Sequence, residues 1–294
     1  MESTEMAAIR EMLAASPRPA NLAERRQRLD ALGSRYIIPT DVLVEPVDAN
    51  GVPAEWTTTP AADPTRAILF LHGGGYISGS IVSHRHMIAQ AGREAEARTL
   101  ALGYRLAPEH PFPVALEDAL SGYRYLLSEG FAPEHIVIAG ESAGGGLAVA
   151  ALVSLRDQGM PLPGGTWCSS PWVDLEMTGA TMTTKAAVDP LIQRNYLLEL
   201  ATLYLNGVDP RTPLASPLHA DLRGLPPMLI QCGSAETLLD DALRLAGVAA
   251  VADVRTTLQI WPDMIHAWHL FHAQLAEGRS ALAEVGAFVR ATLS

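Results

Sequence analysis

A serine flanked by glycines stands where a short apolar run changes into a helical pattern. The segment is Gly140-Glu141-Ser142-Ala143-Gly144, preceded by the apolar residues 135–139 and followed by small residues at helical spacing. A serine hydroxyl is a weak nucleophile, so an enzyme that uses one holds it on a tight strand-to-helix turn near a base. The GxSxG pattern also arises by chance, but this setting predicts that Ser142 is a nucleophile.

A tract of glycines follows an earlier apolar run at 66–71, in His72-Gly73-Gly74-Gly75-Tyr76. Glycines leave backbone N–H groups uncovered, and such donors lower the barrier of acyl transfer when they point at the developing oxyanion. We expect the N–H groups of Gly73, Gly74 and Ala143 to form this oxyanion hole. A phosphate-binding loop is the alternative interpretation, but neither GxxxxGK[ST] nor GxGxxG is present in this tract.

A base must lie at the carboxyl edge of the sheet, beside the serine. Of the nine histidines, His266 closely follows the last predicted strand, so we predict that His266 is the base. His266, His269 and His272 are spaced three apart, which raises the question of a metal. No HExxH pattern accompanies them, and we expect no metal site.

A carboxylate should fix the histidine tautomer and stabilise the imidazolium that forms when the serine loses its proton. Glu236 follows the predicted strand at 227–232 and is our candidate. Asp240 stays open as a rival, although an acidic first helical turn would also explain it. In chain order the acid would stand between the serine and the histidine, as in other enzymes with this elbow.

Parallel strands are predicted to position these groups. Apolar runs alternate with helical patterns, which is typical of βαβ units and a parallel sheet. The expected strands lie at 66–71, 98–104, 135–140, 165–170, 227–232 and 255–261, and the helices at 83–96, 114–128, 143–158, 237–250 and 279–293. Residues 36–47 and 52–58 should add a hairpin around Asn50-Gly51, which makes eight strands.

Two segments fall outside this alternation. Residues 4–15 and 19–33 have helical periodicity, separated by Pro17 and Pro19, and residues 173–224 lack a strand but contain a helical pattern at 195–205. We interpret residues 1–34 as the N-terminal helical part of a small cap. Residues 35–294 would be the catalytic domain, with a cap insertion at about 173–224.

Composition narrows the possible partners and compartments. The 294 residues are 48% hydrophobic with a net charge of -11, which argues against a nucleic-acid partner. Glu2, Glu5 and Glu11 stand where a signal peptide would be basic, and no apolar stretch reaches membrane-spanning length. We expect a cytoplasmic protein without a membrane span. Cys168 and Cys232 end apolar runs and are expected as buried thiols.

Three motifs together resemble the bacterial hormone-sensitive lipase family of carboxylesterases: His72-Gly73-Gly74-Gly75, the proline-rich segment 104–113, and the segment 140–145. The resemblance extends over residues 37–292 and implies an α/β-hydrolase fold and ester hydrolysis through a serine triad. The family's acid usually stands in Asp-Pro-Leu-x-Asp. The matching stretch here is 236–240, where Glu236 replaces the first Asp, so Asp240 remains a rival.

From the residues and the resemblance we predict a serine carboxylesterase for short- to medium-chain esters or compact lactones, working through an acyl-enzyme without a cofactor. The partner would be a small-molecule ester, and exposed apolar residues in the last strand and helix could support a homodimer. Two alternatives remain. One is a non-catalytic ligand-binding protein on a hydrolase scaffold, and the other is an amidase or peptidase with the same triad.

The proline-rich loop at 104–113 is expected to be stiff. It can hold Arg105 and Glu109 in ion pairs and support the oxyanion loop.

Overall fold

A mostly parallel sheet of eight strands forms the centre of the computed structural model, which describes residues 3–16 and 18–294. The strands are β1 (Leu43–Asp48), β2 (Pro53–Thr58), β3 (Asp63–Leu71), β4 (Ala97–Leu102), β5 (Ile136–Glu141), β6 (Gly165–Ser169), β7 (Met228–Gly233) and β8 (Thr256–Trp261). Their order is β1-β2-β4-β3-β5-β6-β7-β8. The β1–β2 and β2–β4 pairs are antiparallel and the others parallel, so the predicted sheet is confirmed.

Side chains that alternate along the central strands build a core on each face of the sheet. On β3, Leu69 and Leu71 belong to the larger core, whereas Ile68 and Phe70 belong to the other. The larger core includes residues of α4 (Val114–Ser128), α5 (Ala143–Asp157) and α8 (Leu239–Val251), and the other includes α3 (Ile81–Ala95) and α9 (Ala276–Thr292). Strands buried on both faces read as continuous apolar runs, which explains why the sequence revealed them.

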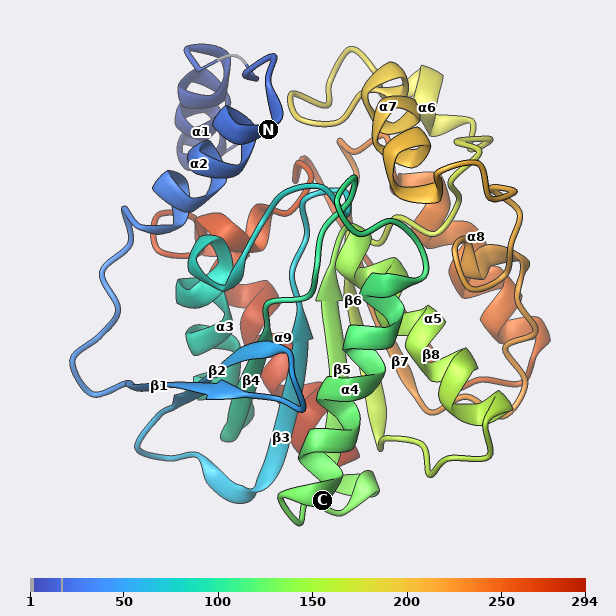
Figure 1. Cartoon of the computed structure of the whole chain (residues 1–294). Helices are drawn as coiled ribbons and strands as arrows, with labels where there is room; N and C mark the ends of the chain where they lie inside the picture. Colours follow the sequence, from blue (N-terminus) through green and yellow to red (C-terminus); the bar gives the residue numbers. More distant parts are fainter. Residues whose placement is uncertain (1–2, 17) are drawn as a thin grey trace.

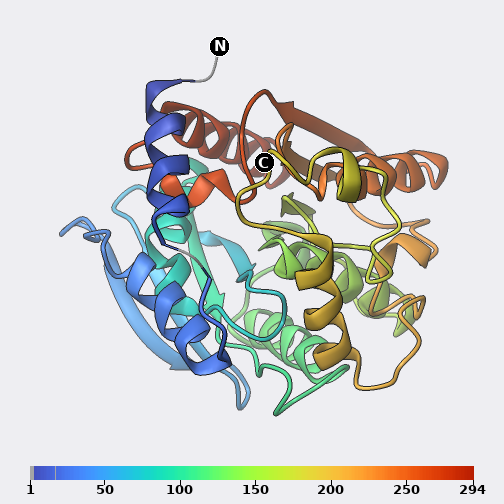
Figure 2. The same cartoon turned by 90° about the horizontal axis from the view of Figure 1, so that it is seen from above.

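Four helices lie beyond the carboxyl edge of the parallel strands (Figure 1). They are α1 (Thr4–Ala14), α2 (Leu22–Gly33), α6 (Thr181–Thr184) and α7 (Arg194–Leu205). Figure 2 shows from above that the two N-terminal helices and α7 stand on opposite sides of this edge. Within 173–224 the structure has no strand, as expected, but the short helix α6 was not predicted. Residues 1, 2 and 17, including the predicted break at Pro17, lie outside the described residues.

The N-terminal hairpin is shorter than expected. Its turn is at Asn50-Gly51, where both residues have positive φ, but β1 begins at Leu43 rather than at residue 36. Pro39 lacks a backbone donor, and its carbonyl accepts a hydrogen bond from the Val42 N–H in a turn. Alternating apolar residues before that turn therefore do not extend the strand.

The loop between β4 and α4 is held by two ion pairs that involve the predicted residues. The Arg105 guanidinium lies 2.6 Å from a carboxylate oxygen of Asp118, whose side chain is buried. The same carboxylate accepts the Arg105 backbone N–H at 2.8 Å. Glu109 pairs with Arg26 of α2 at 2.8 Å, so the loop also contacts the N-terminal helices.

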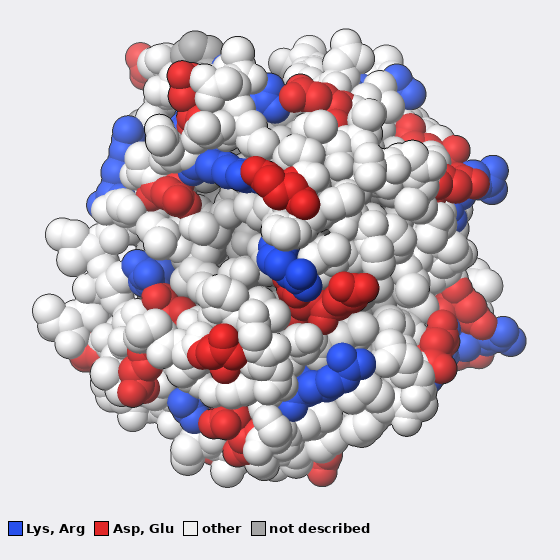
Figure 3. Space-filling view, in the orientation of Figure 1, with Lys and Arg blue, Asp and Glu red and all other residues white. Residues whose placement is uncertain are grey.

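The cysteines, the helices and the charged surface side chains bear on the predictions made from composition. Cys168 and Cys232 are buried free thiols on β6 and β7, as predicted. Among the described helices, none combines the length and apolar character that a bilayer span requires. Basic side chains stand singly or beside acidic ones on the face in Figure 3. Ile260 lies on the edge strand β8 and is partly exposed. The homodimer remains a prediction.

The Asp118 carboxylate should contribute strongly to stability. Asp118→Ala leaves the backbone N–H of Arg105 without its acceptor, so we expect the free energy of unfolding to fall by about 2 kcal/mol in urea titrations. As a control, Asp157→Ala removes an exposed pair with Arg156 and should change it by less than about 0.5 kcal/mol. Equal effects of the two substitutions would contradict this account.

Candidate active site

Ser142 occupies a strained turn between β5 and α5. Its φ of 55° and ψ of -119° place it in a backbone region that side chains rarely adopt, as a nucleophile elbow requires. Close packing forms the turn, since a Cβ on Gly140 would lie 2.0 Å from the carbonyl oxygen of Gly144. The backbone therefore needs glycine at position 140, and the serine side chain is presented at the carboxyl edge of the sheet.

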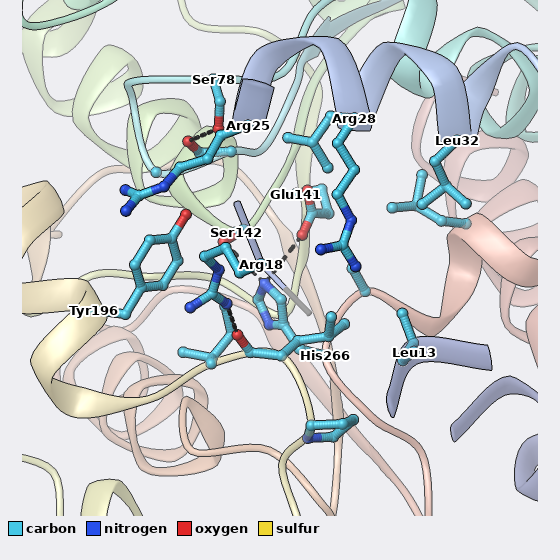
Figure 4. A pocket seen from close by; sticks show the side chains of 18 of the residues that line it. Leu13, Arg18, Arg25, Arg28, Leu32, Ser78, Glu141, Ser142, Tyr196 and His266 are labelled. Atoms are coloured by element: carbon cyan, nitrogen blue, oxygen red, sulfur yellow. Dashed lines mark hydrogen bonds and ion pairs between the residues drawn. The ribbon is translucent and has the colours of Figure 1, made fainter. Parts of the chain in front are cut away.

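His266 bridges Ser142 and Glu236. The Nε2 atom of His266 is 3.0 Å from Ser142 Oγ, and Nδ1 is 3.0 Å from Glu236 Oε2. The other carboxylate oxygen of Glu236 accepts the Gly233 N–H at 2.6 Å and the Ser170 hydroxyl at 2.8 Å. One oxygen is thus held by the chain while the other faces the imidazole (Figure 4 shows Ser142 and His266).

Asp240, the other candidate for the triad acid, forms a hydrogen bond elsewhere. It is the second residue of α8, and its carboxylate accepts the Ala180 N–H at 2.6 Å. That bond ties the start of α8 to the segment before α6. Of the two candidate carboxylates, Glu236 is therefore the one that hydrogen-bonds His266.

Burial and neighbouring carboxylates set the charges of this site. Burial alone would lower the pKa of His266, but hydrogen bonds to Glu141 and Glu236 outweigh it and raise the pKa above its usual range. Burial raises the pKa of Glu236, against the opposing effect of its hydrogen bond to His266. The imidazolium form is therefore strongly stabilised in this site.

The predicted oxyanion donors are not equivalent in the structure. Gly74 and Gly75 line the cavity above Ser142, but the N–H of Gly73 is directed at His84 Nε2, 3.3 Å away. Ala143 is the first residue of α5, so its N–H has no intrahelical acceptor. Gly74 has a φ of 114°, and a Cβ there would lie 2.2 Å from the Ser78 carbonyl oxygen, which requires glycine.

The proline-rich loop supports the glycine tract, as predicted. The Tyr104 hydroxyl donates to the carbonyl oxygen of His72 at 2.7 Å, and the two rings stack with centroids 4.1 Å apart. The Ala107 N–H donates to the Tyr76 carbonyl at 2.9 Å. These bonds hold both ends of the glycine turn against a rigid loop.

A cavity of about 220 Å³ lies over Ser142 and His266. Its apolar lining comes mainly from the helices beyond the sheet and the segment before α7: Leu13, Leu29, Leu32, Leu191, Leu197 and Leu200. Three arginines and a tyrosine also line it, namely Arg18, Arg25, Arg28 and Tyr196 (Figure 4). The arrangement suits an apolar substituent attached to a polar reacting group.

Three residues of the site were missed by reasoning from sequence. Glu141 and His84 line the cavity and contact each other, and Ser170 holds Glu236. A charged residue directly before the nucleophile, at the end of a buried strand, was a signal for Glu141. His84 and Ser170 become neighbours of the site only through the fold.

His269 and His272, which follow His266 at intervals of three residues, lie in surroundings that differ from those of His266. His269 is fully buried, and its ring contacts Ser169 Oγ and Gln231 Oε1 at 2.9 Å each. Burial lowers the pKa of His269 to about 3. Burial likewise lowers the pKa of His272 to about 4. Burial therefore disfavours the imidazolium form of both rings, and both are neutral near pH 7.

Known proteins resemble both the sequence and the fold. A family model for the alpha/beta hydrolase fold matches residues 68–270. A crystal structure of an esterase from the bacterial hormone-sensitive lipase family superposes with a TM-score of 0.97 and 45% identity over 100% of both chains. The chain belongs to this family. This solved neighbour and several relatives are named as esterases or carboxylesterases, and this chain is a carboxylic ester hydrolase.

Two curated relatives extend the comparison. An acetyl-hydrolase from Streptomyces hygroscopicus is 46% identical over 99% of this chain and 97% of its own length. An esterase from Acinetobacter venetianus is 33% identical over 93% of this chain and 91% of its own. A structure of EstE5 soaked with p-nitrophenyl butyrate has a TM-score of 0.96 and 43% identity, covering 99% of both chains. These matches therefore extend over the helices beyond the sheet as well as over the sheet itself.

The close packing of the turn at Ser142 predicts that replacing Gly140 is damaging. Gly140→Ala should lower the free energy of unfolding by about 2 kcal/mol or more and abolish esterase activity, because the new methyl group meets backbone. Gly247→Ala is a control on α8, where a Cβ meets nothing within 4 Å, and should stabilise the protein by up to about 1 kcal/mol. Urea unfolding and p-nitrophenyl ester assays measure both, and an active, stable Gly140→Ala enzyme would refute the packing argument.

Proposed function

We propose that the protein is a serine carboxylesterase in which Ser142 is the nucleophile, His266 the general base and Glu236 the orienting acid. The observation that carries this proposal is the continuous contact from Ser142 Oγ through both nitrogens of His266 to Glu236, on the floor of an apolar cavity. Such a constellation is recognised by geometry and roles.

In the first half of the reaction, His266 takes the proton of Ser142 as the serine oxygen attacks the ester carbonyl. The N–H groups of Gly74, Gly75 and Ala143 would receive the negative oxygen. Gly75 replaces Gly73 in this proposal because the Gly73 N–H faces His84. Collapse of the tetrahedral intermediate transfers the proton from His266 to the leaving alcohol and forms an acyl-enzyme.

In the second half, His266 takes a proton from water, and the resulting hydroxide attacks the acyl-enzyme. The proton returns to Ser142 when the acid leaves, so proton transfers balance over the cycle. Glu236 stays ionised and stabilises the imidazolium in both halves. All atoms of the products come from the ester and one water molecule.

The preferred esters would have short- to medium-length acyl chains or be compact lactones. Support comes from the cavity volume of about 220 Å³ and from its leucine lining. The names of two neighbours, an acetyl-hydrolase and EstE5 soaked with p-nitrophenyl butyrate, point in the same direction.

A cap composed of residues 1–34 and about 173–224 would limit the depth of the cavity. Three contacts between these segments support it. Arg25 of α2 pairs with Glu199 of α7 at 2.7 Å, and the Arg18 guanidinium lies 3.4 Å from the centroid of the Tyr196 ring. Arg18 also donates to the carbonyl oxygen of Leu191.

Removal of the nucleophile or the base should abolish turnover. Ser142→Ala and His266→Ala should each reduce kcat by roughly a million-fold, because the reacting groups act as a unit. A fluorophosphonate probe should label the wild-type enzyme on Ser142 and leave Ser142→Ala unlabelled. An unlabelled, inert wild-type protein would instead support a ligand-binding role. Matched ester and amide substrates separate the esterase from an amidase.

The two candidate acids can be compared directly. Glu236→Gln should lower kcat by roughly 10,000-fold, since the amide favours the wrong histidine tautomer. Asp240→Asn should keep kcat within a few-fold because its carboxylate contacts the Ala180 N–H. Circular dichroism and urea unfolding control for folding. If Asp240→Asn were the more damaging change, the acid assignment would have to be exchanged.

Cavity size should determine chain-length preference. Leu29→Trp fills part of the cavity and should reduce kcat/KM for octanoate esters far more than for acetate. Leu243→Trp, at a partly exposed position on α8 that does not line the cavity, is the control. A p-nitrophenyl ester series measures the profile. Faster hydrolysis of long-chain triglyceride emulsions than of short esters would contradict a closed cap.

A further inference from the structure

The Glu141 carboxylate lies between two histidines. Its side chain is only 4% exposed, with Oε1 3.3 Å from His266 Nε2 and Oε2 3.1 Å from His84 Nε2. We infer that Glu141 is a positioning residue, which holds the catalytic imidazole by the nitrogen that faces Ser142, and that His84 holds Glu141 by donating its Nε2–H to Oε2. With that proton in place, the nearby Gly73 N–H does not donate to the same nitrogen. This inference rests on the proposed function, because it assigns His266 the role of base.

The support behind Glu141 is rigid. His84 lies in the first turn of α3, and its Nδ1 is 2.8 Å from Ser83 Oγ. Ser83 and Ser80 exchange hydrogen bonds in a capping box, and the Ser80 hydroxyl donates to Asp30 of α2 at 2.5 Å. A chain of contacts therefore runs from the N-terminal helices to His266.

Glu141 also contacts the glycine loop. A Cβ on Gly73 would lie 1.7 Å from Glu141 Oε2, so this glycine packs flat against the carboxylate. The same side chain thus borders the base on one side and the glycine tract on the other. It fixes the position of His266 relative to the N–H groups of Gly74 and Gly75.

The chemical role follows from the proton that His266 carries. Once Nε2 has taken the proton of Ser142, the new N–H has a second acceptor in Glu141 Oε1. The buried anion stabilises the imidazolium and limits rotation of the ring until the leaving alcohol is protonated. Glu141 gains and loses no proton itself, so the proton balance of the two half-reactions is unchanged.

In the resting enzyme the contact with Glu141 also favours the protonated form of His266. That form cannot act as a base, because an imidazolium cannot accept the proton of Ser142. Burial alone would raise the pKa of Glu141, but hydrogen bonds to His266 and His84 lower it to about 2. Glu141 is therefore the more acidic of the two carboxylates that contact His266, as the pKa of Glu236 is raised. Of the other titratable groups, His269 interacts with the ring and His84 with Glu141, while Arg18, Arg25, Arg28 and Tyr196 line the cavity above them.

The pH dependence of kcat/KM tests the inference. This ratio rises with pH as His266 of the free enzyme loses its proton. We call the low-pH side of this profile, where kcat/KM rises, the acid limb. Neutralising Glu141 lowers the pKa of His266, so Glu141→Gln should move the acid limb to lower pH by about 1 to 2 units. Glu141→Asp retains the charge and should keep the limb near the wild-type position. Glu284→Gln, an exposed acid on α9, is the control for net charge.

His84→Phe should move the limb in the same direction by a smaller amount. It should have no further effect when combined with Glu141→Gln, since His84 acts through Glu141. If Glu141→Gln does not fold, the single His84→Phe variant carries the test. An unchanged limb, with kcat/KM lowered equally at every pH, would mean a merely structural role and overturn the inference.

Fluorophosphonate labelling separates this inference from the proposed function. A wild-type enzyme that is unlabelled and inert would refute the esterase mechanism itself. A labelled, active wild-type enzyme whose acid limb is insensitive to Glu141→Gln would refute only the role of Glu141.

Discussion

The turn that carries Ser142 is the constraint on which the site depends. Its backbone N–H donates to the Ser169 carbonyl at 2.9 Å, and its carbonyl accepts the Trp172 N–H at 2.9 Å. The strained residue is thus hydrogen-bonded to the end of the neighbouring strand β6 as well as to its own helix. Strain of this kind persists only where the surroundings over-determine the conformation, and here two strands and a helix do so.

Much of the arrangement could be predicted from sequence because the information was local. Runs such as 67–71 and 136–139 are buried on both faces and therefore apolar throughout, which marks strands without an alignment. Parallel strands bring their carboxyl ends to one edge, so Ser142, Glu236 and His266 could be grouped before any distance was known. The structure brings these three side chains into contact.

What could not be predicted depends on contacts between distant segments. No local pattern indicates that His84 of α3 lies against Glu141 of β5, or that the Gly73 N–H turns toward that histidine instead of the cavity. Helix α6 has only four residues, too few for periodicity to emerge. Buried carboxylates need several donors to remain favourable, and such partners are supplied by the fold rather than by neighbours in sequence.

The contacts over the cavity have a kinetic consequence. The N-terminal helices and α7 meet there through the pair of Arg25 with the half-exposed Glu199 and the stacking of Arg18 on Tyr196. Contacts of this type contribute about 1 kcal/mol or less each near solvent. Breaking these two contacts therefore costs only a few times the thermal energy, and screening by salt lowers the cost of the ion pair further. We therefore expect the ester to enter and the acid to leave through brief openings between these helices, while the contacts of Ser142, His266 and Glu236 beneath them stay in place.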